Sequence, residues 1–378
     1  MTEPLGPVSL VHAFSRRNAG DGLLVDLTIE ALGEAGISRS ECQVLALDAN
    51  SFPDIASIRQ VPGEPAARLS WRLAGAAAEL ARSAFGSGQV EEMLTGSRAV
   101  VAVGGGYLVA DSLTRQAGVM LNHFAQLQAA AAMQRPTVYL PQSIGPLPGR
   151  LGQLVRSRLA KIDRVWVRDD QTLAELGLPN VQRCPDLAVM KLGLGFSKLQ
   201  PATSDGPPII VARSLPHAGT LVPRLRALHR ALPEALFAVQ AETEGHRSDR
   251  EFYRKCGFHD GGRLGQLLES PSGPVVSVRL HGAIAALLAG RPAIHLAYER
   301  KGWGAFGDLG LDEFCHDARE FDPVLVADQL RSLVANPANY WRSIAEASSR
   351  LASAWADMVR DLSTRLGTAV SERPGAMT

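Results

Sequence analysis

The chain has 378 residues, of which 46% are hydrophobic and 20% are charged, and its formal net charge is +1. This composition excludes an intrinsically disordered protein, and the length predicts two domains. The near-neutral charge excludes a long-range attraction to nucleic acid, so an anionic ligand has to be bound by local charges.

Four cysteines lie far apart in the sequence, at positions 42, 184, 256 and 315. Their spacing matches no metal site, so we expect reduced thiols, no bound metal ion and a cytoplasmic protein. We recognise neither a signal peptide nor a membrane-spanning stretch in the sequence. Peripheral contact with the inner face of the membrane stays open.

The first part of the chain predicts a strand at Val8–Phe14, from which the turn SRRNAGD leads into a helix. Asn18 or Asp21 can cap this helix, but a loop after the first parallel strand is also where open sheets bind ligands. Both residues are therefore candidates for substrate contact. Further on, we expect a strand at 42–48 and an alanine-rich helix that ends near residue 85.

Three consecutive glycines, Gly104, Gly105 and Gly106, follow a predicted buried strand at 98–103. Without Cβ atoms, such a turn allows the backbone to approach a ligand and to donate N–H groups to it. The turn matches neither GxGxxG nor the phosphate loop GxxxxGK[ST]. A substrate contact is therefore predicted, whereas a dinucleotide or ATP site is not.

Four more polar residues in this half are candidates for a site. Asp111 follows the glycine turn, and His123 lies on the predicted helix 113–134, although a histidine on a helix more often packs than catalyses. Arg168 ends a predicted strand, where it can pair with a neighbouring aspartate or bind an anion. Asp186 lies in a turn at another strand end.

The segment 191–208 is rich in glycine, proline and serine, which predicts a linker between domains 1–190 and 191–378. Strands and helices alternate on both sides of this segment. Such alternation is the pattern of doubly wound parallel sheets. We therefore predict an α/β chain of two Rossmann-like domains.

The strongest signal for a site lies between Pro274 and Trp303, where an apolar run predicts a buried strand and then a helix. Because strand side chains alternate, Arg279 and His281 should project from the same side, where the helix has unpaired N–H groups. A following parallel strand should bring Lys301 to the same edge of the sheet. We therefore expect an anion site at this edge.

Six motifs occur in the order NAGD, GGGYLVAD, LPQSIGPL, VWVRDDQTLAELG, CPDLAV and SVRLHGAIAALLAGRPAIHLAYERKGWGAFGDLGL. In this combination the chain resembles the polysaccharide pyruvyl transferases, from about Asn18 to Leu311. The resemblance implies a GT-B-like fold, in which the two Rossmann-like domains face a central cleft. It also implies transfer of a pyruvyl group from phosphoenolpyruvate to a hydroxyl pair of a free or lipid-linked glycan, which forms a ketal, releases phosphate and needs no cofactor.

The resemblance also implies roles for particular residues. Arg168, Arg279 and His281 match positions that the family associates with phosphoenolpyruvate, so we expect two cationic clamps and a proton donor or phosphate partner. This assigns phosphoenolpyruvate to the C-terminal domain and the acceptor to the N-terminal domain. The base for the sugar hydroxyl should be one of four N-terminal residues: Asp21, Asp111, His123 and Asp186. The other expected substrate contacts are Asn18, Gly104, Gly105, Gly106 and Lys301.

Two other functions stay open from the sequence. A nucleotide-sugar glycosyltransferase of GT-B type would use the same architecture, and Glu234 and Glu242 have the spacing of an acidic pair. The residues between them predict a strand, however, which would separate the two carboxylates by roughly 26 Å. A non-catalytic glycan-binding or scaffolding module is the second alternative, but a scaffold has no physical reason to keep Arg168, Arg279 and His281 together.

Overall fold

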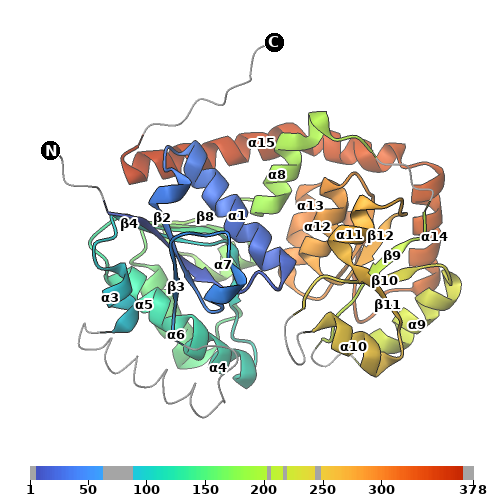
Figure 1. Cartoon of the computed structure of the whole chain (residues 1–378), viewed down its shortest axis with the longest axis horizontal. Coiled ribbons are helices and arrows are strands. Elements are labelled where there is room, and N and C mark those ends of the chain that lie inside the picture. Colours follow the sequence, from blue (N-terminus) through green and yellow to red (C-terminus); the bar gives the residue numbers. More distant parts are fainter. Residues whose placement is uncertain (1–5, 63–87, 202–205, 216–218, 243–247, 369–378) are drawn as a thin grey trace. The chain divides into compact units, whose positions relative to one another are not determined.

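The computed structural model describes residues 6–62, 88–201, 206–215, 219–242 and 248–368 (Figure 1). It divides into unit 1, which comprises residues 1–16, 21–187 and 356–378, and unit 2, which comprises residues 17–20 and 188–355. The division follows Leu187, whereas the sequence predicts a boundary at residue 190. The C-terminal residues from Ala356 belong to unit 1. The alanine-rich helix predicted up to residue 85 lies outside the described residues.

Unit 1 contains a fully parallel sheet with the strand order β3-β2-β1-β4-β6-β7-β8, in which β5 also pairs with β6. From β1 the chain adds β2 and then β3 on one side. It then returns to the other side of β1 with β4, followed by β6, β7 and β8. The boundary between β1 and β4 is therefore the switch point of a doubly wound sheet. The strands are β1 Val8–Ala13, β2 Cys42–Ala46, β3 Ile58–Gln60, β4 Ala99–Ala102, β5 Gly105–Leu108, β6 Thr137–Ile144, β7 Arg164–Val167 and β8 Val181–Arg183.

The helix predicted over 113–134 is two helices in the structure, α4 and α5, which meet at His123. This residue leaves the helical region, with φ −128° and ψ −25°. The described helices of this part of the chain are α1 Ala19–Glu34, α3 Gln89–Leu94, α4 Leu113–Asn122, α5 Phe124–Ala132, α6 Gly149–Leu159 and α7 Asp170–Leu176. Short 3₁₀ turns lie at Arg39–Glu41 and Ala49–Ser51.

Unit 2 contains a second parallel sheet with the order β11-β10-β9-β12-β13-β14. Its switch point lies between β9 and β12. The strands are β9 Ile209–Val211, β10 Leu236–Val239, β11 Asp260–Arg263, β12 Val275–Ser277, β13 Ala293–Ala297 and β14 Cys315–Asp317. The helices are α9 Leu221–Ala231, α10 Asp249–Cys256, α11 Leu264–Glu269, α12 Leu280–Leu288, α13 Arg300–Asp308 and α14 Pro323–Ala335, with 3₁₀ turns at Phe196–Lys198 and Asp312–Phe314.

Two helices continue across the division between the units, α8 Leu187–Gly195 and α15 Ala338–Leu366. The segment predicted as a linker therefore begins inside α8, whose apolar residues from Leu187 to Met190 are buried. None of the described helices is long and apolar enough to cross a membrane.

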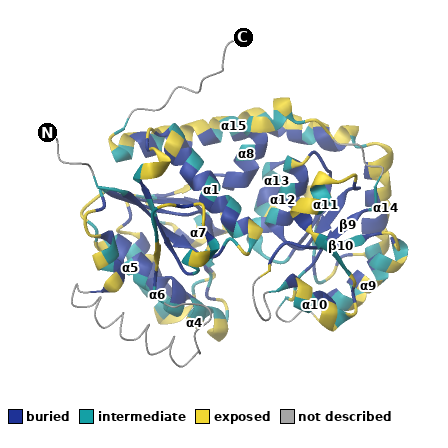
Figure 2. Cartoon of the chain, viewed as in Figure 1, coloured by how far each residue is buried: buried dark blue, intermediate teal, exposed yellow. Residues whose placement is uncertain are grey.

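The central strands form the buried layer of each unit, as Figure 2 shows in dark blue. Every residue of β1, β4, β6, β12 and β13 is buried. Strands of a parallel sheet that is covered on both faces are apolar along their whole length, and for this reason the sequence predicted the buried strands. The prediction of an α/β chain with a parallel doubly wound sheet in each half is confirmed.

Candidate functional site

The predicted strand, turn and helix around Arg279 are present in unit 2. β12 ends at Ser277, and Arg279 is the extended residue that precedes α12, with φ −93° and ψ 120°. The Ser277 hydroxyl donates to the Arg279 carbonyl at 2.6 Å and accepts from the Arg279 N–H at 3.1 Å. The Ser277 side chain therefore stabilises the turn that leads from β12 into α12.

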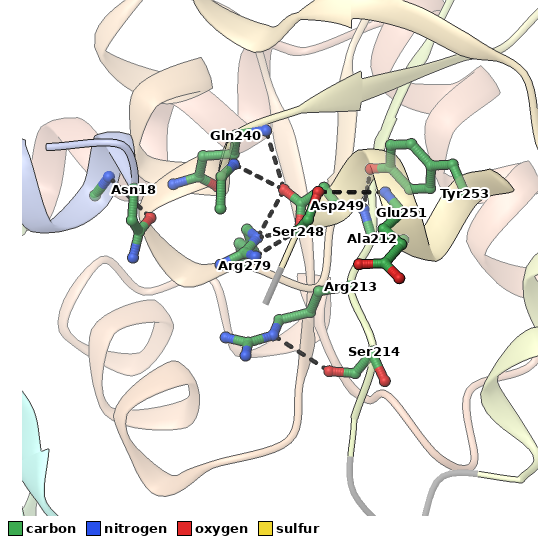
Figure 3. Close-up of polar contacts among 12 residues, drawn as sticks. Asn18, Ala212, Arg213, Ser214, Gln240, Ser248, Asp249, Glu251, Tyr253 and Arg279 are labelled. Carbon is green, nitrogen blue, oxygen red and sulfur yellow. Dashed lines mark hydrogen bonds and ion pairs between the residues drawn. The ribbon is translucent and has the colours of Figure 1, made fainter. Parts of the chain in front are cut away.

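The guanidinium of Arg279 has an internal counter-ion. Its side chain is 7% exposed, and its Nε lies 3.0 Å from both carboxylate oxygens of Asp249, a fully buried residue at the start of α10 (Figure 3). Asp249 also accepts the backbone N–H groups of Gln240 and Ala241, at 3.0 and 2.9 Å. Arg279 thus joins the β12–α12 turn to the end of β10, and its buried charge is balanced by protein.

Arg168 in unit 1 is held in the same way. Its side chain is 2% exposed, forms an ion pair with the buried Asp186 and donates from Nε to the Ser143 hydroxyl at 3.1 Å. Two predicted site residues are therefore partners of one another. The neighbouring aspartates, expected as the alternative partners, are engaged elsewhere: Asp169 caps α7 and Asp170 pairs with Arg183.

Residues 17–20, which include the first three residues of NAGD, belong to unit 2. Asn18 forms an antiparallel bridge with Ala241, and the N–H of Ala19 donates to the Gln240 carbonyl at 3.3 Å. The Asn18 side chain accepts from the Gly20 N–H at 3.3 Å, as expected of a residue at the start of α1. This segment is therefore attached beside the residues that bind Asp249.

Gly20 lies directly against His281. A Cβ atom on Gly20 would be 2.8 Å from both Cβ and Nδ1 of the histidine. Because the Cβ of His281 is fixed to its backbone, a rotamer change alone cannot relieve this contact. The glycine of NAGD is therefore explained by the close approach of a half-buried imidazole.

Partly exposed cations gather at the carboxyl edge of the unit 2 sheet. Arg213 follows β9 and is in register with Arg279, because Val211 pairs with Ser277 two residues earlier on each strand. Its Nη1 donates to the Tyr298 hydroxyl at 3.1 Å, and its guanidinium lies 5.7 Å from the Tyr298 ring. Tyr298 follows β13, and β12 lies between β9 and β13, so the contact between Arg213 and Tyr298 spans the end of β12.

Two further cations surround Tyr298. The Lys301 ammonium is 5.9 Å from the Tyr298 ring and 2.6 Å from the Glu299 carboxylate, and Arg319 donates to the Tyr298 carbonyl at 3.4 Å. Figure 3 shows the Arg279 guanidinium bound to Asp249, whereas the Arg213 guanidinium has no bond to that aspartate. Lys301 was predicted, whereas Arg213 and Tyr298 were missed. Arg213 follows an apolar strand as Arg279 does, and this was the available signal.

His295 lies beneath this edge on β13 and is 2% exposed. Burial lowers its pKa to about 4, against the hydrogen bond to the Ser277 carbonyl at 2.8 Å, and the nearby Lys301 and His281 lower it further. A Cβ on Gly302 would be 2.4 Å from its Nε2. The folded protein therefore holds a neutral imidazole under the turn that carries Arg279.

This buried histidine should make folding sensitive to acid. The folded pKa of about 4 lies below the ordinary value of 6.5, so the unfolded chain binds the proton first. The stabilisation is complete above pH 6.5 and is lost as the pH falls toward 4, by about 3 kcal/mol. Urea unfolding at several pH values between 7 and 4 gives the free energy of unfolding of the wild type and of His295→Asn. The free energy should fall more steeply with decreasing pH in the wild type, and an equal pH dependence in the two proteins would contradict this account.

The other predicted residues have more ordinary surroundings. Asp111 is exposed and pairs with Arg115 at 3.2 Å, one helical turn away. A Cβ on Gly104 would be 3.0 Å from the Pro141 carbonyl, so close packing accounts for this glycine. Asp21 lies in the first turn of α1. His123 contacts His12 and Tyr107, which the sequence did not single out.

Comparison with known proteins gives one family and one fold. The sequence profile of the family described as polysaccharide pyruvyl transferase matches residues 18–248. No curated protein sequence gives a match. The matched range covers the NAGD segment, the glycine turn, the Arg168–Asp186 pair and the strand that carries Arg213.

Solved structures match over nearly the whole chain. Sucrose-phosphate synthase from Thermosynechococcus elongatus has a TM-score of 0.57 at 14% identity, covering 95% of this chain and 98% of its own. UDP-GlcNAc 2-epimerase from Methanocaldococcus jannaschii has a TM-score of 0.53 at 11% identity, covering 95% and 99%. Anabaena Alr3699/HepE, in complex with UDP and glucose, has a TM-score of 0.54 at 11% identity, covering 96% and 100%. At these identities the likeness shows the GT-B-type fold alone.

Proposed function

The chain belongs to the polysaccharide pyruvyl transferase family, and from this premise we propose that it transfers the pyruvyl group of phosphoenolpyruvate to two hydroxyls of a sugar, with release of phosphate. The observation that carries the proposal is the group of partly exposed cations at the carboxyl edge of the unit 2 sheet. Phosphoenolpyruvate has a phosphate and a carboxylate, so it needs at least two cationic contacts. Arg213, Lys301 and the N-terminal N–H groups of α12 supply such contacts.

The sequence led us to expect Arg168 and Arg279 to bind phosphoenolpyruvate, and we now propose a structural role for both. Arg279 is balanced by Asp249 and Arg168 by Asp186, so we assign both to holding strand ends in place. We assign the role of guanidinium clamp to Arg213, because it is partly exposed and its contact with Tyr298 spans the end of β12, the strand that leads to His281. Its planar fork suits a phosphate or a carboxylate.

The proposed chemistry is an addition followed by an elimination. An acid, which we assign to His281, protonates the methylene carbon of phosphoenolpyruvate, and the adjacent carbon becomes an oxocarbenium-like electrophile. One sugar hydroxyl adds to that carbon and gives up its proton. The carbon–oxygen bond to phosphate then breaks, and the second hydroxyl adds with loss of its proton to close the ketal. Cations beside the departing phosphate stabilise its charge.

The acceptor is assigned to unit 1, and a free or lipid-linked glycan fits the family's chemistry. Incubation of the purified chain with phosphoenolpyruvate and a panel of glycans should release phosphate and add the mass of pyruvate less water to one glycan. Phosphoenolpyruvate should also raise the melting temperature, because it binds only the folded chain.

The same assay tests the competing function. Parallel incubations with labelled nucleotide sugars would detect the glycosyl transfer of a GT-B glycosyltransferase. Label transferred to the glycans, without phosphate release or thermal stabilisation by phosphoenolpyruvate, would overturn the proposal. Binding of glycans without either reaction would indicate a non-catalytic module.

The Gly20→Ala variant should lower turnover by about 100-fold, because the new methyl group displaces the His281 imidazole and misplacement of a catalytic group by about 1 Å has an effect of this size. Initial rates of phosphate release measure this effect. Gly33→Ala is the matched control, since a Cβ at this position of α1 meets nothing within 4 Å. Near-normal rates in Gly20→Ala would remove the link between NAGD and His281.

A further inference from the structure

A cluster of aromatic and imidazole rings lies at the switch point of the unit 1 sheet. His12 is 2% exposed at the end of β1 and has φ 69°, a left-handed conformation that side chains other than glycine rarely adopt. Its N–H donates to the Gln126 side chain at 2.7 Å. This backbone turns the His12 ring toward β5 and β6, where it meets Tyr107 and Tyr139.

The cluster is polar, and burial disfavours a charge on two of its members, His12 and Tyr139. His12 Nε2 lies 2.9 Å from the Tyr139 hydroxyl, and its Nδ1 lies 3.3 Å from Nδ1 of His123. Burial, and then the neighbouring His123, hold the pKa of His12 well below 6.5. Burial likewise raises the pKa of Tyr139 above its usual range. Arg168 carries a charge near Tyr107, and this charge is balanced by Asp186.

Tyr107 stacks on both imidazoles with a single face of its ring. Its centroid is 4.4 Å from that of His12 and 4.9 Å from that of His123, with interplanar angles of 23° and 28°. Rings on opposite faces would be separated by close to the sum of these distances, whereas the two imidazole centroids are 5.5 Å apart. Both imidazoles therefore support one face.

The Tyr107 ring is rigid and partly accessible. Its hydroxyl donates to the Val103 carbonyl at 3.0 Å, which fixes the ring in its plane, and the residue is half-buried. The buried Gly105 lies against this ring, since a Cβ atom on it would be 3.0 Å from Cδ1 of Tyr107, and the exposed Gly106 follows. The glycine turn thus makes room for a partly exposed aromatic residue at the place where doubly wound sheets bind ligands.

We propose that the Tyr107 ring is the platform on which a hexopyranose ring of the acceptor glycan stacks. The axial C–H face of a pyranose is apolar, and the face of an aromatic ring is a better partner for such a surface than for a phosphate. The inference rests on the proposed function for the identity of the acceptor as a glycan. It assigns a binding role to Tyr107 and a supporting role to His12 and His123.

The test is saturation-transfer NMR on the full chain with methyl β-D-glucoside, methyl β-D-galactoside and methyl α-D-mannoside. Saturation of aromatic protons should transfer to the C–H protons of at least one glycoside. Tyr107→Ala should abolish this transfer and weaken glycoside binding at least about tenfold. Tyr107→Phe keeps the ring and should stay within about threefold of wild type. Trp303→Ala, which removes a 43% exposed ring from unit 2, should change nothing.

Phosphoenolpyruvate separates this inference from the proposed function. The thermal shift that it causes should be the same in wild type and Tyr107→Ala, which also shows that the variant is folded. Transfer to no glycoside in the wild type, or undiminished transfer in Tyr107→Ala, would overturn the platform. Loss of transfer in the variant without any effect of phosphoenolpyruvate would support the platform and refute the donor. Displacement of the glycosides by uridine alone would indicate a nucleobase site and overturn the platform.

Discussion

The Asp249→Asn variant should be less stable than the wild type by about 3–5 kcal/mol, because it leaves the buried Arg279 guanidinium without a counter-ion. Asparagine has the shape of aspartate and can still accept hydrogen bonds, so the change isolates the charge. Asp249 also receives two backbone N–H groups at the end of β10, and these contacts weaken with it. Urea unfolding at pH 7 measures the difference.

Asp111→Asn is the matched control for this prediction. Asp111 forms an exposed ion pair with Arg115, and exposed pairs contribute at most about 1 kcal/mol. The double variant Asp249→Leu with Arg279→Met should recover much of the loss, because apolar residues often replace a buried pair without penalty. A stability loss in Asp249→Asn no larger than that in Asp111→Asn would show that the pair does not hold the turn.

His281→Ala should reduce phosphate release by about 10²- to 10⁴-fold, the usual contribution of a positioned proton donor. The imidazole is half-buried at the second position of α12, so its removal should change the free energy of unfolding little. Rates with phosphoenolpyruvate and the glycan that wild type modifies, together with urea unfolding, measure both quantities.

His259→Ala, which removes an exposed histidine, should keep the wild-type rate. Arg279→Ala should behave differently from His281→Ala. It leaves the buried Asp249 carboxylate without its counter-ion, so it should lower stability as well as activity. A wild-type-like rate in His281→Ala would exclude this residue as the donor. If Arg279→Ala were inactive but as stable as the wild type, the Arg279 guanidinium would have to bind the substrate directly.

The sequence predicted the local part of this site because the signals were local. Apolar residues before Arg279 and alanines after His281 determined a strand, a turn and a helix, and the right-handed crossover determined that β13 is parallel. Arg279 follows an apolar strand, where a guanidinium has to be neutralised, and the sequence predicted a bound anion where the structure has Asp249.

The long-range part could not be predicted from the same pattern. Asp249 lies 30 residues before Arg279, in a segment where it looks like an ordinary first-turn acid of an amphipathic helix. His12 and His123 are 111 residues apart, and they meet only in the folded unit 1, where the end of β1 lies beside the junction of α4 and α5. Arg168 and Asp186 were each identified as site residues, but nothing in their spacing indicated that they neutralise one another.

The short segment Arg17–Gly20 has a consequence for engineering. It belongs to the second unit although it precedes nearly all of the first, and residues 356–378 return to the first unit after the second is complete. No single cut in the gene separates the two halves. A chimera that exchanged only residues 188–355 would place a His281 from one protein against the NAGD segment of another. Residues 17–20 and 188–355 should therefore be exchanged together.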